Sequence, residues 1–169
     1  MFFFVSPNYN KAIRNIGKEL KKVKWDPVDI DLFVQTKEYV DTAVVPLLPL
    51  SIGENMKTIA SKGVFTNIIS QELERQMKGR IMLLPPFTYF EKIDDDSDNR
   101  IKKWENIIKQ HFRHVVFLTC DERWQKAGNP FIWFPSIPLE HMDQDLKRKL
   151  IQEQIEQIMN ILLQYWRQP

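Results

Sequence analysis

Three short apolar segments recur along the chain, and helical patterns separate each from the next. Residues 42–50, 80–84 and 114–118 are almost wholly apolar and rich in Val, Ile and Leu. Such strands are typical of a parallel sheet that is buried on both faces. A fourth segment at 130–134 lies between prolines, which favours an edge strand. The sequence therefore predicts an α/β fold, with a largely parallel sheet of about four strands and helices on both faces.

The helices are predicted from apolar residues spaced three and four apart. These segments are residues 27–40, 64–77, 101–112 and 143–167. Asp26 and Pro27 suit the cap and first turn of the first helix. Pro46 and Pro49 are expected to close the first strand, and residues 51–62 to form a loop. Residues 85–89, beginning Pro-Pro, are expected to follow the second strand as a loop.

The chain divides into an arm and one domain. Residues 1–24 are predicted to be a basic N-terminal amphipathic arm, and residues 25–169 a single α/β domain. Within the arm, residues 9–24 carry an apolar stripe of Ile13, Ile16, Leu20 and Val23 among six Lys and Arg residues. The arm could touch an anionic surface, or its stripe could pack on the domain as a solvated helix. Residues 1–22 could also be an extended start.

The overall charge and the cysteine content exclude several classes. Lys and Arg number 24 and Asp and Glu 22, so a net charge of +2 gives no reason to expect nucleic acid. No apolar run approaches the roughly 18–20 residues of a membrane span. The apolar start is shorter than the about 7–15 residues of a secretory signal. A single cysteine, Cys120, fits a reducing compartment, so we expect a cytoplasmic protein without membrane insertion.

Polar residues follow the predicted strands. Ligands of open α/β sheets bind beyond the carboxyl ends of the strands, so these residues form the candidate pocket. For two of them, Glu54 and Asn55, the start of a helix is the alternative interpretation. The candidate pocket residues are Ser51, Glu54, Asn55, Thr88, Tyr89, Asp121, Glu122, Arg123 and His141.

Other chemistry has weaker support in the sequence. The histidines His111, His114 and His141 do not have the spacing of a metal site. The acidic segment 94–99 lacks the glycine and glutamate positions of an EF-hand, which favours a capping turn. Cys120 follows a strand, as a nucleophile would, but no known signature surrounds it and a small buried residue is the alternative. We therefore expect no catalytic residue, no metal and no cofactor.

Three short motifs resemble the YpiF-like family of uncharacterised proteins from Bacillus and its relatives. They are Lys24-Trp25-Asp26-Pro27-Val28-Asp29, the run at 41–46, and Leu84-Pro85-Pro86. The resemblance covers roughly residues 23–169 and leaves the arm unmatched. It implies no activity, because none is established for that family.

A more distant resemblance is to the creatininase-like metal amidohydrolases. The order of a Trp-Pro helix, an apolar strand ending in proline, a long helix and a strand ending in Pro-Pro is similar. The resemblance implies a creatininase-like or Rossmann-like three-layer sandwich. It places Ser51, Gly53 and Lys62 where that family has metal ligands, and Asp121 and Arg123 at two later ligand positions. Because four of these five cannot serve as ligands, the implied metal chemistry is lost.

The sequence therefore favours an uncharacterised cytoplasmic α/β domain that acts as a non-catalytic binding or assembly factor. The alternative is a small hydrolase-like enzyme with its cleft around Asp121, Glu122 and Arg123. The terminal helix is apolar on more than one side near its end, which predicts a protein partner or self-association there, such as a homodimer. The candidate interface residues are Ile158, Leu162, Leu163 and Trp166.

Overall fold

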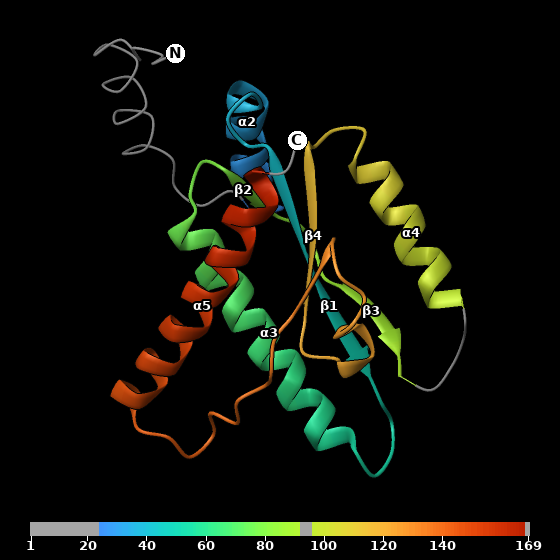
Figure 1. The fold of residues 1–169 in the computed structure, drawn as a ribbon, viewed down its shortest axis with the longest axis vertical. Coiled ribbons are helices and arrows are strands. Elements are labelled where there is room, and N and C mark those ends of the chain that lie inside the picture. Colours follow the sequence, from blue (N-terminus) through green and yellow to red (C-terminus); the bar gives the residue numbers. More distant parts are fainter. Residues whose placement is uncertain (1–23, 92–95, 168–169) are drawn as a thin grey trace.

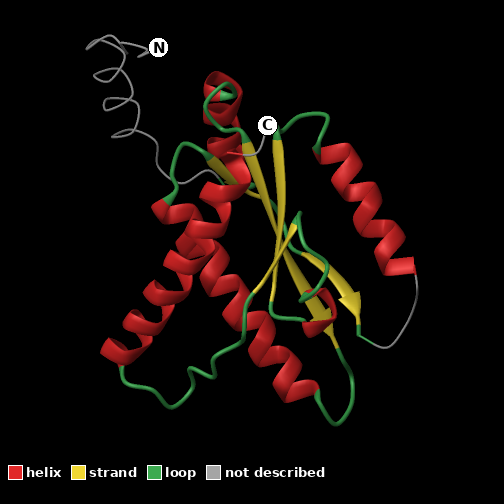
Figure 2. Cartoon of the chain, in the orientation of Figure 1, coloured by secondary structure: helices red, strands yellow, loops and turns green. Residues whose placement is uncertain are grey.

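A computed structural model describes residues 24–91 and 96–167, so the predicted arm lies outside the described residues except for Lys24. A five-stranded parallel sheet forms its centre, and helices cover both faces (Figures 1 and 2). The prediction of a largely parallel α/β sheet is confirmed. The strands are β1 (Thr42–Leu50), β2 (Ile81–Leu83), β3 (Phe87–Phe90), β4 (His114–Thr119) and β5 (Phe131–Trp133).

The edge beside β1 consists of two strands in line. β2 pairs with the first half of β1 and β3 with the second half, both in parallel. Pro85 and Pro86 interrupt the edge, because neither can donate a backbone hydrogen bond. The expectation of a loop at 85–89 is therefore wrong in part, since residues 87–90 return to the sheet as β3. On the other side of β1 lie β4 and then β5.

Pro46 and Pro49 lie inside β1, although the sequence predicted that they close it. The backbone oxygens of Val44 and Leu50 accept hydrogen bonds from the β2–β3 edge. Because alternate residues face the same neighbour, Pro46 faces the interruption between β2 and β3. Pro49 faces the opposite side, past the last residue of β1 that pairs with β4. At these two positions no neighbouring strand would accept a hydrogen bond from a backbone N–H group. Proline, which lacks that group, is therefore tolerated inside β1.

The helices pack on the sheet in two separate layers. Helices α2 (Pro27–Thr36) and α4 (Asp96–Ile108) cover the face that carries Val45 and Phe117. Helices α3 (Met56–Gln76) and α5 (Gln144–Arg167) cover the face that carries Val44 and Val116. Neighbouring residues of one strand therefore enter different cores, as the period of two requires. The result is a three-layer arrangement.

The ends of the helices follow from local chemistry. The Asp26 carboxylate accepts hydrogen bonds from the backbone N–H groups of Val28 and Asp29, so the predicted cap of α2 is confirmed. α3 begins at Met56, which corrects the predicted loop at 51–62. α4 begins at Asp96, earlier than expected, since Asp96 and Asp98 suit the positive end of a helix. Residues 94 and 95 of the predicted acidic turn lie outside the described residues.

Candidate functional site

A hydrogen-bonded group of three side chains lies at the carboxyl ends of β3 and β4. The Tyr89 hydroxyl donates to Asp121 Oδ2 over 2.6 Å, and Trp124 Nε1 donates to the Tyr89 oxygen over 3.1 Å. All three residues are buried. Burial raises the pKa of the Tyr89 hydroxyl well above its usual range, and the hydrogen bond to the Asp121 carboxylate raises it further. We call Tyr89, Asp121 and Trp124 the strand-end triad.

Arg123 covers the triad from outside. Its guanidinium stacks over the rings of Tyr89 and Trp124, at 4.7 and 4.8 Å from the two centroids. Its backbone N–H donates to Asp121 Oδ1 over 3.0 Å, because Asp121 caps the short 3₁₀ helix η1 (Glu122–Trp124). Both carboxylate oxygens of Asp121 therefore already accept hydrogen bonds. The triad and Arg123 form a packed structural unit.

Glu122 points away from the triad toward α3. Lys62 Nζ lies 2.6 Å from Glu122 Oε2, and this hydrogen bond lowers the pKa of the Glu122 carboxyl. The Lys62 side chain is largely buried, whereas 61% of the Glu122 side chain is exposed. Lys62 stands at a position where the creatininase resemblance expects a metal ligand, and here an ammonium group occupies it. The pair joins α3 to the end of β4.

The residues after β1 form another separate group. The Ser51 hydroxyl donates to Asn55 Oδ1 over 2.5 Å, and Asn55 Nδ2 donates to Glu91 Oε2 over 2.6 Å. Asn55 occupies the N-cap position of α3, but its side chain makes no capping hydrogen bond. Glu54 is exposed. Glu91 was not predicted, and its place immediately after β3 is the signal that would have found it.

The predicted pocket residues do not line a single cavity. Thr88 and Tyr89 line a hollow of about 240 Å³ together with Ser97 and Arg100. His141 lines a different hollow of about 390 Å³ with Lys57, beside the start of α3. Neither hollow is lined by Asp121, Glu122 or Arg123. Ser97 and Arg100 were not predicted, because no pattern in the sequence shows that the first turn of α4 approaches β3.

Cys120 is buried at the end of β4, with 1% of its surface exposed. Burial raises the pKa of its thiol to about 12. A nucleophilic cysteine requires the opposite shift, toward the thiolate. Within residues 24–91 and 96–167, no three His, Cys, Asp or Glu side chains are grouped so that they could hold a metal ion.

The predicted interface residues of α5 lie in different surroundings. Ile158 and Leu162 belong to the core between α5 and the sheet. Trp166 is half-buried, and its Nε1 donates to Thr42 Oγ1 over 2.9 Å. Leu163 is 40% exposed. Of the four, Leu163 alone offers a large exposed apolar surface.

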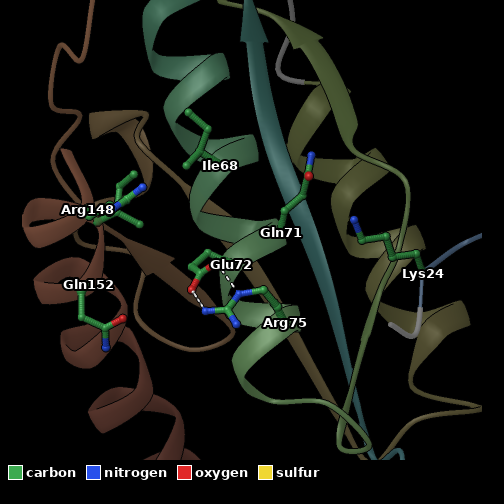
Figure 3. A pocket seen from close by; sticks show the side chains of 8 residues that line it. Lys24, Ile68, Gln71, Glu72, Arg75, Arg148 and Gln152 are labelled. Atoms are coloured by element: carbon green, nitrogen blue, oxygen red, sulfur yellow. Dashed lines mark hydrogen bonds and ion pairs between the residues drawn. The ribbon is translucent and has the colours of Figure 1, made fainter. Parts of the chain in front are cut away.

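A larger hollow than these two lies over α3 and α5, away from the strand ends. Its volume is about 620 Å³. Figure 3 shows side chains of α3 between Lys24 on one side and Arg148 and Gln152 of α5 on the other. A second hollow of about 340 Å³ shares Ile68, Arg148 and Ile151 with it. We call the two together the α3–α5 groove.

The fold and the side chains at the strand ends define the class of this protein. It is a three-layer α/β protein whose polar side chains at the strand ends form hydrogen bonds with one another. The chain belongs to the family described as "Protein of unknown function (DUF2487)", which matches residues 31–166. It is 41% identical over 146 residues to "Uncharacterized protein YpiF" of Bacillus subtilis (strain 168). That match covers 85% of this chain and 98% of the relative. The predicted membership of the YpiF-like family is therefore confirmed.

Two further comparisons were negative. No solved structure matches the chain. In the described part of the chain, none of the helices is both long and apolar enough to cross a membrane.

Proposed function

We propose that this protein is a non-catalytic binding or assembly domain of the cytoplasm. One observation supports the proposal: the Asp121 carboxylate, the best candidate for a general base at the strand ends, is buried and already accepts a hydrogen bond at each oxygen. It accepts from the Tyr89 hydroxyl and from the Arg123 backbone N–H. A general base must be free to accept a proton from a substrate. The single buried cysteine supports the cytoplasmic location.

The proposed binding surface is the flank of α5 that carries Leu163. Leu163 and Ile161 are each 40% exposed, but at 100° per residue they lie on opposite sides of the stripe that α5 buries. Met159 and Trp166, both partly buried, lie toward the Leu163 side. Leu163 therefore extends an apolar surface outward from Met159 and Trp166 on this flank. A partner, or a second copy of the chain, would cover it.

The pair Leu163→Glu and Ile161→Glu tests this surface. We expect Leu163→Glu to reduce self-association, measured as molar mass by light scattering over a range of concentrations. Ile161→Glu is the matched control because its exposure is equal. Thermal unfolding of both variants separates association from folding. A monomeric wild type, with a loss of several kcal/mol for Leu163→Glu alone, would mean that the residue is core.

The alternative is a small hydrolase-like enzyme with its cleft around Asp121, Glu122 and Arg123. The hollow lined by Thr88, Tyr89 and Arg100 beside the triad favours it. The hydrolase alternative predicts that the protein cleaves p-nitrophenyl acetate or p-nitrophenyl phosphate. It also predicts that Arg123→Gln abolishes this activity. Cleavage that survives purification to constant specific activity and depends on Arg123 would refute the non-catalytic proposal.

A further inference from the structure

The α3–α5 groove has an apolar floor that the described residues leave open. Ile68 and Ile151 line both of its hollows, and Ile137 and Leu139 line the smaller one. Val64 lies at the same end and is 60% exposed although it is in the middle of α3. Exposed aliphatic residues beside a groove are typical of surfaces that another element covers.

The position of Lys24 indicates which segment lies beside this groove. Lys24 is the first described residue, and it lines the larger hollow. Its backbone is fixed, because its N–H donates to Asp29 Oδ2 over 2.9 Å and it forms a β-bridge with Leu83. The preceding 23 residues must therefore start from the rim of the groove.

We propose that residues 9–23 cover the α3–α5 groove of the same chain as an amphipathic helix. Ile13, Ile16, Leu20 and Val23 recur at the spacing of one helix face. A helix from Ile13 to Val23 rises about 15 Å, and α3 from Val64 to Arg75 rises about 16 Å. The apolar stripe is therefore about as long as the part of α3 that lines the groove.

The charges of the segment agree with this placement. On a helix, Lys11, Arg14, Lys18 and Lys22 fall on the side opposite the apolar stripe. With the stripe on the groove floor, these cations point to water and away from Arg75 and Arg148 on the rim. Chain connection also favours this occupant, because a tethered segment has a high effective concentration at its own groove.

The docked segment has a consequence for partner binding, which rests on the proposed function. A partner that binds along α5 would have to compete with residues 9–23, so removal of the segment would expose the groove. The docking itself does not depend on the proposed binding function. Cross-linking of the segment to the groove therefore tests the docking alone, whereas the Leu163 and Ile161 variants test the binding surface.

Cross-linking in the full chain tests the docking. The variant Glu19→Cys/Gln71→Cys places one thiol beside the apolar stripe and one in the groove, at an exposed position of α3. The control Glu19→Cys/Lys103→Cys places the second thiol at an exposed position of α4, across the sheet. Native Cys120 is buried and gives little background reaction. The probe is a bismaleimide with a short spacer.

We expect the groove pair to cross-link within one chain on the order of tenfold faster than the control pair. Adding Ile16→Glu to the groove pair is expected to reduce the rate to that of the control. Cross-links mainly between two chains would overturn the proposal and identify a second copy as the occupant. Equal rates for the groove and control pairs would also overturn it. A single cooperative thermal unfolding transition in each variant shows that the domain is intact.

Discussion

Trp166, in the last turn of α5, donates a hydrogen bond from Nε1 to the hydroxyl of Thr42, the first residue of β1. The guanidinium of Arg80 stacks on the same indole ring at 3.7 Å, and it also lies 3.4 Å from Asp41. The last turn of α5 is thereby fixed to the start of the central strand. The carboxyl end of α5 therefore packs against the amino end of β1.

The contact predicts a measurable loss of stability for Trp166→Phe. The substitution keeps most of the ring but removes the donor to buried Thr42, so we expect a loss of about 1 kcal/mol in the free energy of unfolding. Gln164→Ala, at an exposed position two residues away, is the control and should change it by less than about 0.5 kcal/mol. Urea unfolding measures both. Equal losses in the free energy of unfolding for the two variants would show that the hydrogen bond from Trp166 to Thr42 contributes nothing to stability.

The strand-end triad predicts a larger effect for Tyr89→Phe. Loss of the hydroxyl leaves Asp121 Oδ2 and Trp124 Nε1 without this buried partner, so we expect a loss of about 2–3 kcal/mol. Thr88→Val, on the exposed neighbour in β3, should cost less than about 0.5 kcal/mol. A double-mutant cycle of Tyr89→Phe with Asp121→Asn should show coupling of at least about 0.5 kcal/mol. Additive losses would mean that the two residues act independently.

The sequence predicted the sheet well because the strand signal is local. Residues 42–50, 80–84 and 114–118 are almost wholly apolar, and this pattern is typical of parallel strands buried on both faces. β3 was missed because Pro85 and Pro86 mark the end of a strand, while its partner, the second half of β1, is distant in sequence. Pro46 was misread for a related reason: its place in a central strand depends on the gap in the neighbouring edge.

The candidate site was predicted only as a region. The rule for strand ends singled out Tyr89 and Asp121, which lie 32 residues apart in sequence and form a hydrogen bond. It could not show that Asp121 faces Tyr89 whereas Glu122 faces Lys62. Those directions depend on the turn of η1, which the Asp121 side chain itself caps. Pairing between side chains on different elements is tertiary information that no local pattern contains.

The Lys62–Glu122 pair predicts an electrostatic effect with little effect on stability. Because Glu122 is mostly exposed, we expect Lys62→Gln to cost less than about 1 kcal/mol. The pKa of the Glu122 carboxyl should rise toward its ordinary value of 4.5 when the hydrogen bond from Lys62 is removed. Carboxyl NMR titration of wild type and variant measures this shift. A Glu122 signal that titrates identically in wild type and variant would contradict the prediction.

The buried Cys120 thiol predicts that stability falls at high pH. Burial raises the pKa of this thiol from 9.0 to about 12 in the folded protein. Above pH 9 the unfolded chain therefore loses the proton that the folded chain keeps, so deprotonation favours unfolding. The free energy of unfolding should fall by about 1.4 kcal/mol per pH unit from this group, over the window between the two pKa values.

Cys120→Ala isolates this contribution from that of other groups, because Tyr89, whose pKa is also raised, remains in both proteins. Urea unfolding between pH 8 and pH 10.5 should give a steeper decline for wild type than for Cys120→Ala, and the two slopes should agree below pH 9. In the same range, native wild type should react with iodoacetamide at least about tenfold more slowly than the urea-unfolded chain, because only the thiolate attacks. Parallel slopes, or equal alkylation rates, would place the thiol in a solvated site with an ordinary pKa.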